Sequence, residues 1–344
     1  MNDQAIELNE IIKRDNSIIF DLLSEKGKAI FFPKKGILGQ SAEAKGKKYN
    51  ATIGLATLDD GSPMRLPCIE KNIPLDPKEI FPYSPSYGNM ELRQLWQQKI
   101  KEKNPSLSGE ISLPVATNAL THGLSMVAYL FLNPGEKVIV TDKYWGNYNL
   151  LFKNAYGTEF TTFNTFTETG FDIASFETAL KESSENKKTI LLNFPNNPAG
   201  YTPTDEEVEK IVEIIKTDAE AGNKIIVIID DAYFGLVFKD GVYKESIFAK
   251  LADLHENIFA IKIDGATKED YVWGLRIGFI TYASKGATQE TYTALADKTG
   301  GAVRGNISNI STLSQNLFLK ALSSPTYEEE KKENYDILRE RCEE

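Results

Sequence analysis

Short runs of isoleucine, valine and leucine alternate with amphipathic segments from residue 113 onward. The apolar runs predict strands at residues 113–117, 137–141, 159–163, 188–194, 224–229, 257–263 and 276–282. The segments between them predict helices at residues 122–132, 146–153, 173–181, 204–218 and 245–254. This alternation is typical of an α/β fold in which a mostly parallel sheet is sandwiched by helices.

The flanking parts of the chain follow other patterns. Isoleucine and leucine recur at roughly helical spacing over residues 4–24, which predicts a helix, and the next forty residues are glycine-rich and predicted to be irregular. Asn89 is a candidate N-cap for a helix that runs to about residue 103, and Thr204 and Glu207 have the spacing of a capping box. Residues 285–344 predict helices throughout.

Composition narrows the functional classes. The 344 residues are 41% apolar and 26% charged, as in ordinary globular proteins. A formal net charge of −10 argues against a nucleic-acid partner or an anionic membrane surface. Cys68 and Cys342 lie far apart, which fits a reducing compartment, and two histidines leave little for a zinc site. The first residues lack a basic-then-apolar signal pattern and no apolar run reaches transmembrane length, so we expect a cytoplasmic protein.

One stretch, residues 263–279, combines a lysine and an arginine. Lys268 stands among small residues, and Arg276 follows eight positions later between glycines, next to an apolar strand. A lysine that forms an imine must lose its proton near neutral pH, which calls for burial or a nearby cation. An arginine fork suits a phosphate. Together they match the needs of a pyridoxal-phosphate site, although a lysine near a strand is more often a solvated surface residue.

Ligands of such a sheet gather beyond the carboxyl ends of its strands, so the residues that follow each strand are candidates. Asp230 ends an apolar strand, where it could face a protonated ring nitrogen or serve as a helix cap. Asn197 lies in a tight loop rich in turn formers and can aim an amide N–H at a ligand. Trp145 could stack on a flat heterocycle or pack in the core. The segment 118–125 could form a phosphate-binding helix start or an ordinary loop.

The order of these motifs resembles the class I/II aminotransferases of the fold-type I pyridoxal-phosphate family, and most closely their aspartate/aromatic subgroup, over residues 49 to 310. The resemblance implies that Lys268 carries the cofactor as an imine, that Arg276 binds its phosphate, and that Asp230 pairs with its ring nitrogen. It assigns the other cofactor contacts to Asn197, Tyr233, Trp145, Ala119, Leu120, Thr121 and, from the neighbouring subunit, Tyr83. It assigns substrate contacts to Trp145, Asn197, the Ile53-Gly54 loop and, across a homodimer, Arg304.

The implied reaction is a ping-pong transfer of an amino group between an acidic or aromatic L-amino acid and a 2-oxo acid such as 2-oxoglutarate. Residues 1–65 would be an arm of the small domain, residues 66–310 the large cofactor domain, and residues 311–344 helices that lead to the small domain. Rival interpretations are a pyridoxal-phosphate lyase and a chain that binds cofactor or dimerises without turnover. A nicotinamide-dependent dehydrogenase has little support, because no Gly-x-Gly-x-x-Gly follows a strand.

The chain departs from the family pattern in three places. Gly265 stands where a phosphate-binding serine is usual, and Ala119-Leu120 replaces the common glycines of the phosphate turn. The chain ends at Glu344, within a predicted helix, and no candidate remains for the arginine that binds the substrate α-carboxylate. We therefore expect a truncated or unusual member of the family.

Overall fold

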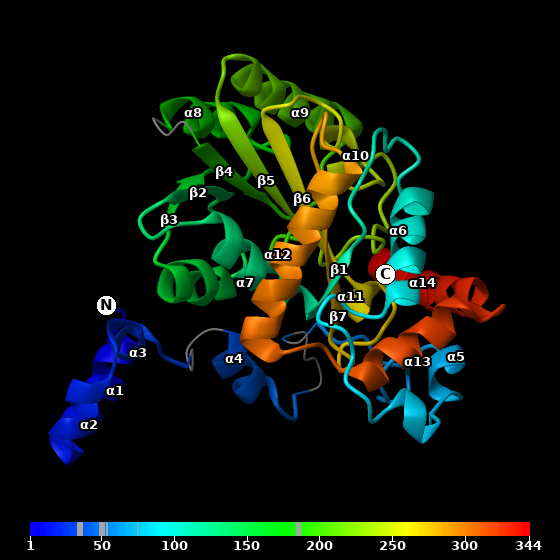
Figure 1. The fold of residues 1–344 in the computed structure, drawn as a ribbon, viewed down its shortest axis with the longest axis horizontal. Helices are drawn as coiled ribbons and strands as arrows, with labels where there is room; N and C mark the ends of the chain where they lie inside the picture. The colour runs from blue at the N-terminus through cyan, green and yellow to red at the C-terminus, as the bar shows by residue number, and fades with distance from the viewer. Residues whose placement is uncertain (33–36, 48–51, 53, 74, 184–186) are drawn as a thin grey trace.

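The centre of the molecule is one seven-stranded sheet with the order β1-β7-β6-β5-β4-β2-β3 (Figure 1). The computed structural model describes residues 1–32, 37–47, 52, 54–73, 75–183 and 187–344. The strands are β1 (Val115–Asn118), β2 (Lys137–Thr141), β3 (Glu159–Phe163), β4 (Lys187–Leu192), β5 (Lys224–Asp230), β6 (Ile258–Asp264) and β7 (Ile277–Ala283). All neighbours are parallel except β7, which runs antiparallel to β1 and β6. The predicted mostly parallel α/β sheet is confirmed.

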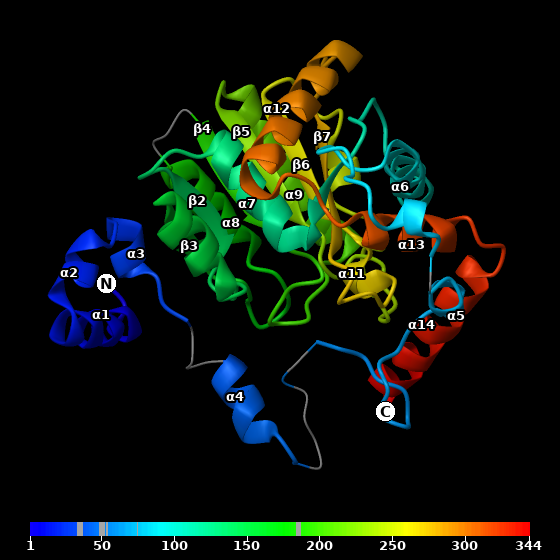
Figure 2. The same ribbon diagram turned by 60° about the horizontal axis from the view of Figure 1, so that its bottom comes forward.

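Helices surround the sheet and also form the two ends of the chain. In order they are α1 (Asp3–Asp15), α2 (Ser17–Leu22), α3 (Glu25–Ala29), α4 (Ile37–Ala44), α5 (Pro67–Glu70), η1 (Pro77–Glu79), α6 (Met90–Lys103), α7 (Ala119–Phe131), the π-helical η2 (Asn149–Ala155), α8 (Ile173–Glu182), α9 (Asp205–Glu220), α10 (Phe248–Leu251), α11 (Ala266–Glu269), α12 (Gln289–Ile307), α13 (Thr312–Leu322) and α14 (Tyr327–Glu343). In Figure 2, α1, α2 and α3 lie to one side of the sheet and α14 lies beside α5 on the other.

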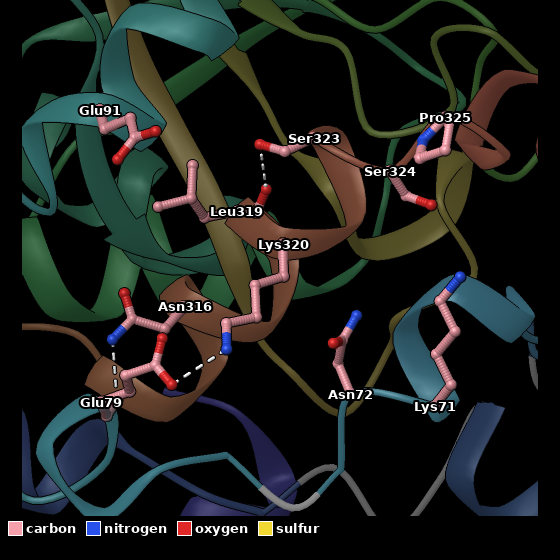
Figure 3. Close-up of a pocket in the computed structure, with 10 residues that line it drawn as sticks. All are labelled: Lys71, Asn72, Glu79, Glu91, Asn316, Leu319, Lys320, Ser323, Ser324 and Pro325. Atoms are coloured by element: carbon pink, nitrogen blue, oxygen red, sulfur yellow. Dashed lines mark hydrogen bonds and ion pairs between the residues drawn. The ribbon is translucent and has the colours of Figure 1, made fainter.

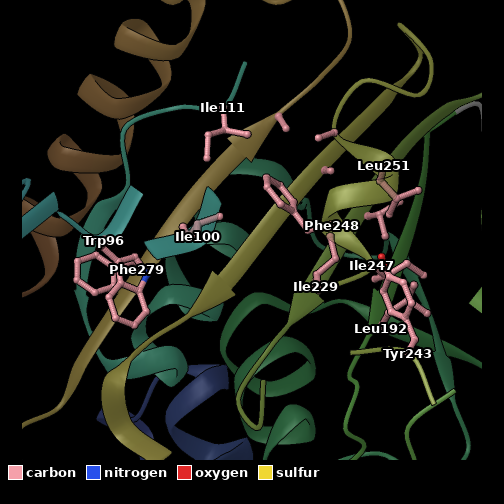
Figure 4. Packing of buried hydrophobic residues seen from close by; sticks show 14 of the residues in the cluster. Trp96, Ile100, Ile111, Leu192, Ile229, Tyr243, Ile247, Phe248, Leu251 and Phe279 are labelled. Carbon is pink, nitrogen blue, oxygen red and sulfur yellow. The ribbon is translucent and has the colours of Figure 1, made fainter. Parts of the chain in front are cut away.

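Two apolar cores cover the two faces of the sheet, because successive side chains of a strand point to opposite faces. Val227 and Ile229 of β5 pack on one side with α6, α8, α9 and α10, and part of this core is drawn in Figure 4. Ile226 and Ile228 of the same strand pack on the other side with α7, η2 and α12. Burial on both faces explains why the strands are continuous apolar runs rather than alternating ones.

Several sequence-based predictions need correction at the ends of elements. The helix predicted over residues 4–24 is broken at Asn16, whose side chain accepts hydrogen bonds from the N–H groups of Ile18 and Ile19 and caps α2. The segment predicted to be irregular after it contains α3 and α4. Arg276 was placed in a strand but precedes β7, with φ of 55°.

Two predicted helices in the α/β region differ from expectation, one in length and one in type. The one expected at 245–254 is helical only in α10, because Ser246 is held outside it: its N–H donates to Asn104 and its hydroxyl to Asp231. The one expected at 146–153 is helical from residue 147 but is π-helical over η2, and the Gly146 carbonyl before it accepts both the backbone and the side-chain N–H of Asn149. The caps predicted at Asn89 and Thr204 are confirmed.

Three further observations concern anchors and metals. Cys68 is buried and Cys342 is exposed, and both are free thiols. Within the described ranges, no helix has the length and apolar character needed to cross a bilayer. The same part of the chain contains no group of three or more His, Cys, Asp or Glu side chains placed to hold a metal ion.

Candidate active site

The reversed direction of β7 brings the candidate residues to one edge of the sheet. The parallel strands β5 and β6 end there, at Asp230 and Asp264. Since β7 is antiparallel to β6, its beginning lies at the same edge, and Asp264 is paired in register with Phe279. Lys268 on α11 and Arg276 just before β7 both belong to the connection between these two strands. The topology therefore places the lysine, the arginine and the carboxylate of Asp230 at one edge.

Lys268 is half-buried, and its amine lies 4.5 Å from the centre of the Tyr233 ring. Burial lowers the pKa of the amine, and the positive charge of Arg276 lowers it further, while the negative charge of Asp230 opposes the shift. An amine with a lowered pKa is a better nucleophile near neutral pH, because more of it is unprotonated. The environment predicted for Lys268, burial beside a cation, is present.

Asp230, whose charge acts on this amine, is only 3% exposed. Burial raises its pKa from 3.8 to about 6, against hydrogen bonding from the Tyr148 hydroxyl and the charge of Lys268. Tyr148 is fully buried and donates its hydroxyl to a carboxylate oxygen of Asp230. The sequence reasoning missed Tyr148. Its signal was a hydroxyl three residues after Trp145, and the two rings pack edge to face with centroids 5.6 Å apart.

The loop after β4 that contains Asn197 contacts Tyr233, the tyrosine beside Lys268. The side-chain amide of Asn197 is 3.5 Å from the Tyr233 hydroxyl, at the outer limit of a hydrogen bond. The backbone N–H of Asn197 donates to the side chain of Asn193 at 2.8 Å, and the Asn193 amide donates to the carbonyl of Asp230 at 2.7 Å. Asn193 thus ties the loop to the end of β5.

The part of the site that suits an anion is formed largely by backbone groups at the start of α7. Ala119 and Arg276 both have positive φ, 60° and 55°, and the N–H of Ala119 donates to the carbonyl of Arg276 at 3.0 Å. Asn118 does not cap α7 with its side chain, so the first turn of α7, with Leu120 and Thr121, can offer N–H groups to an anion. A Cβ at Gly278 would lie 2.6 Å from the backbone of Ala119, so this approach requires glycine.

Gly265 explains one departure from the family pattern. A Cβ at this position would lie 2.4 Å from the carbonyl oxygen of Ile277 and 2.6 Å from Cα of Gly278. A serine therefore does not fit without moving the start of β7. The hydroxyl of Thr267, two residues further along, donates to the same Ile277 carbonyl at 3.3 Å.

A cavity of about 220 Å³ opens above the lysine. Lys268, Tyr233 and Gly54 line it, together with Leu55, Ala56, Leu236, Tyr271, Trp273 and Leu338. A larger hollow of about 480 Å³ lies elsewhere, beside α13 (Figure 3). It contains none of the predicted site residues, and its Lys320 is paired with Glu79 at 2.9 Å. We therefore assign the chemistry to the smaller cavity.

Some predicted residues lie away from this cavity. Tyr83 is 91% exposed, and Arg304 is exposed on α12. Neither is among the residues that line the cavity, and the same holds for Asp230, Asn197, Arg276 and the start of α7. Trp145 is half-buried and packs on Tyr148, which in turn donates to Asp230. Ile53 lies outside the described residues.

These groups fit pyridoxal phosphate on structural grounds. The half-buried amine of Lys268 suits an aldehyde, and the buried carboxylate of Asp230 suits a protonated ring nitrogen. Arg276 is exposed, its backbone carbonyl accepts the N–H of Ala119 at the start of α7, and its guanidinium donates to the Trp273 carbonyl at 3.3 Å. An arginine and a helix N-terminus together suit a phosphate.

The chain is similar in sequence to a family of known proteins. The sequence profile of the family described as "Aminotransferase class I and II" matches residues 50–344. The chain is 27% identical over 249 residues to a "Probable aspartate/prephenate aminotransferase" of Aquifex aeolicus, covering 71% of this chain and 57% of the relative. It is 30% identical over 208 residues to an "Aspartate aminotransferase" of Sulfurisphaera tokodaii, covering 59% and 48%. The chain spans about half the length of these curated relatives.

Solved structures give the same fold. An aminotransferase of Anaerococcus prevotii superposes with a TM-score of 0.79 at 25% identity, covering 93% of this chain and 80% of that one. An aspartate aminotransferase of Thermus thermophilus, solved with maleate, superposes with a TM-score of 0.71 at 21% identity, covering 92% and 76%. The second likeness concerns the fold alone.

Proposed function

We propose, on the premise that this chain belongs to the family of class I and II aminotransferases, that it transfers an amino group between an L-amino acid and a 2-oxo acid. Proteins of this family use pyridoxal phosphate. The observation that carries the proposal is the meeting of a half-buried amine, Lys268, with the buried carboxylate of Asp230 and the charge of Arg276. Each has the environment that its part of the chemistry requires.

Pyridoxal phosphate, when bound, supplies an aldehyde and a ring that accepts electrons. Lys268 would be its point of attachment and, once released by a substrate amine, the base that moves a proton at the substrate α-carbon. Asp230 would keep the ring nitrogen protonated. Asn197 and Tyr233 would donate to the phenolic oxygen. Arg276 and the N–H groups at the start of α7 would hold the phosphate.

The relatives indicate the substrate, and two exposed residues indicate the assembly. We infer an acidic or aromatic amino donor with 2-oxoglutarate as acceptor, since the relatives carry names such as aspartate/prephenate aminotransferase. We also infer a homodimer, because Tyr83 and Arg304 are exposed outside the cavity and would serve the neighbour's site. Sedimentation of the purified chain tests the dimer. A cytoplasmic location stays a prediction from composition.

The test of the function starts from Lys268. Wild type, Lys268→Ala and Lys285→Ala are mixed with pyridoxal phosphate, reduced with borohydride, and digested for mass spectrometry. Lys285 is an exposed lysine at the end of β7 and serves as the matched control. We expect the pyridoxyl group on the peptide of Lys268 in the wild type and the Lys285 variant, and its loss in Lys268→Ala. Equal attachment in all three proteins would exclude Lys268 as the attachment point.

A second measurement addresses turnover. Wild type and Lys268→Ala are incubated with 2-oxoglutarate and a panel of amino donors that includes aspartate, phenylalanine and an uncharged aliphatic amino acid. We expect glutamate to form with the acidic or aromatic donors in the wild type alone. Consumption of a donor without any glutamate would favour a lyase. Attachment at Lys268 without conversion of any donor would favour a cofactor-binding chain without turnover.

A further inference from the structure

The turn that carries Lys268 is held from the far end of the chain. Glu269 and Asp270 follow the lysine directly and are both buried, at 5% and 0% exposure. Buried carboxylates are costly unless they meet cations and hydrogen-bond donors. The groups that pair with these two carboxylates come from α6 and α14, two helices that are remote from them in sequence.

Glu269 receives two lysines. Lys103, the last residue of α6, donates to both of its carboxylate oxygens, at 2.9 and 3.1 Å. Lys331 of α14 donates to one of them at 2.8 Å. Burial alone would raise the pKa of Glu269, but the two lysines lower it to about 2. The carboxylate therefore stays ionised, and its contacts fix its orientation.

Asp270 is held by the same helix. The amine of Lys331 lies 3.1 Å from its carboxylate, and the hydroxyl of Tyr327, at the start of α14, donates to the same oxygen. The Lys331 amine also lies 5.6 Å from the centre of the Tyr327 ring. One turn of α14 thus contacts both Glu269 and Asp270, the residues that follow Lys268.

The fit around Glu269 leaves little room for another arrangement. A Cβ at Gly235 would lie 2.6 Å from a carboxylate oxygen of Glu269, so the backbone after Tyr233 packs directly on this side chain. Lys103 also lies over the rings of Trp96 and Phe234, at 4.8 and 5.2 Å. The charge network is therefore enclosed by packed groups.

Helix α14 also contacts the opposite wall of the active-site cavity. Leu338 of α14 lines the cavity that contains Lys268. Arg341 donates to the carbonyl of Thr57 at 2.6 Å and pairs with Asp59 at 2.8 Å. These residues belong to the segment that begins with Gly54. A single helix therefore contacts both the turn of the lysine and the segment that covers the lysine.

We propose that Lys331 and Tyr327 are positioning residues for Lys268: they hold its turn against α14 and thereby keep the amine in its half-buried place beside Tyr233. The inference rests on the proposed function for its meaning. The groups that face the amine itself are Asp230, Arg276 and the Tyr233 ring, and none of them belongs to α14. Lys331 and Tyr327 consequently act through the backbone of the turn.

The test measures the reactivity of the Lys268 amine in the chain without cofactor. Trace acylation at a series of pH values, followed by mass spectrometry of the Lys268 peptide, gives the midpoint at which this amine loses its proton. The variants are Lys331→Met and the milder Tyr327→Phe, which removes only the hydroxyl. Lys331→Arg keeps the charge. A loosened turn admits water to the amine, so its midpoint moves up toward that of an exposed lysine.

Two controls separate positioning from loss of stability. Lys188→Met removes a more deeply buried lysine of β4, which pairs with Asp218 at 2.7 Å, away from α11. Lys332→Met removes the neighbouring exposed lysine of α14, which pairs only with Asp336 in the described structure. We expect both to keep the wild-type midpoint for Lys268, even where Lys188→Met lowers the melting temperature.

The expected result is a rise of about half a pH unit or more in Lys331→Met and Tyr327→Phe, which is about a threefold loss of neutral amine, with recovery in Lys331→Arg. Wild-type midpoints in both variants would overturn the inference, as would an equal shift in Lys188→Met. If Lys331→Met does not fold, the Tyr327→Phe midpoint decides. Because acylation needs no cofactor, this result is independent of whether pyridoxal phosphate attaches at Lys268.

Discussion

The hydroxyl of Tyr148 offers a direct test of the charge state assigned to Asp230. It donates to a carboxylate oxygen at a fully buried position, and the contact lowers a pKa that burial has raised from 3.8 to about 6. The substitution Tyr148→Phe removes this donor and little else, because the ring can stay in place against Phe152 and Tyr144. The carboxylate should then become harder to ionise.

The magnitude follows from the pKa of Asp230. Its folded-state value lies above the unfolded one, so the stability it contributes is present below about pH 4 and lost as pH rises through about 6. The loss is about 3 kcal/mol, since one pKa unit corresponds to about 1.4 kcal/mol. A hydrogen bond to a charged group contributes about 1.5–3 kcal/mol and one to a neutral group about 0.5–1.5 kcal/mol. Tyr148→Phe should therefore cost about 1 kcal/mol more at pH 8 than at pH 5.

The assay is urea unfolding of the chain without cofactor, followed by tryptophan fluorescence at pH 5 and pH 8. Tyr144→Phe is the matched control, because its hydroxyl donates to the uncharged side chain of Asn149 at 3.1 Å. Its effect should be the same at both pH values. The weakened ionisation of Asp230 should also reduce the affinity for pyridoxal phosphate at pH 8, measured by fluorescence quenching.

A penalty for Tyr148→Phe that is the same at pH 5 and pH 8, within the error shown by Tyr144→Phe, would refute the reasoning. It would mean that Asp230 is protonated, or ionised, at both pH values. A larger penalty at pH 5 than at pH 8 would be a stronger contradiction, because it would require a carboxylate that is stabilised by the hydroxyl only when protonated.

Two further predictions concern Gly278 and Trp96. Gly278→Ala should place a methyl group against the backbone of Ala119, and so destabilise the chain by about 1–3 kcal/mol and weaken pyridoxal phosphate binding. The control Gly274→Ala, which has open space around it, should change neither stability nor binding. Thermal unfolding measures the stability, and fluorescence titration measures the binding. Trp96→Phe removes an indole N–H that reaches a buried carboxylate and should cost about 2–3 kcal/mol in urea unfolding, more than Trp273→Phe, whose indole N–H has no partner in the described structure.

The sheet was predictable because its strands are buried on both faces and so appear as continuous apolar runs. The ends of elements were not, where single side chains decide them: Asn16 caps a second helix, and Ser246 is drawn out of a helix by Asp231. The local sequence shows a residue such as Ser246 but not its hydrogen-bond partner, since Ser246 and Asn104 are brought together only by the fold.

The same distinction applies to the site. Lys268, Asp230 and Arg276 could be proposed because each follows or precedes a strand at a predictable edge. Tyr148 and Lys331 could not, because their partners lie 82 and 62 residues away along the chain. No periodicity links such positions. The contacts of Tyr148 and Lys331 can be recognised only once the segments that carry them are packed in the folded chain.

The connection between β6 and β7 has a consequence for redesign of the chain. Lys268 and Arg276 both lie within it, and its two ends are hydrogen-bonded to each other in neighbouring strands. The spacing between the amine and the guanidinium is therefore set by one continuous piece of backbone. A circular permutant with new termini in the loop between β3 and α8 would leave that piece uncut. An inserted residue anywhere between Glu269 and Leu275 would alter the reach between the two groups, and with it the length of molecule that can touch both.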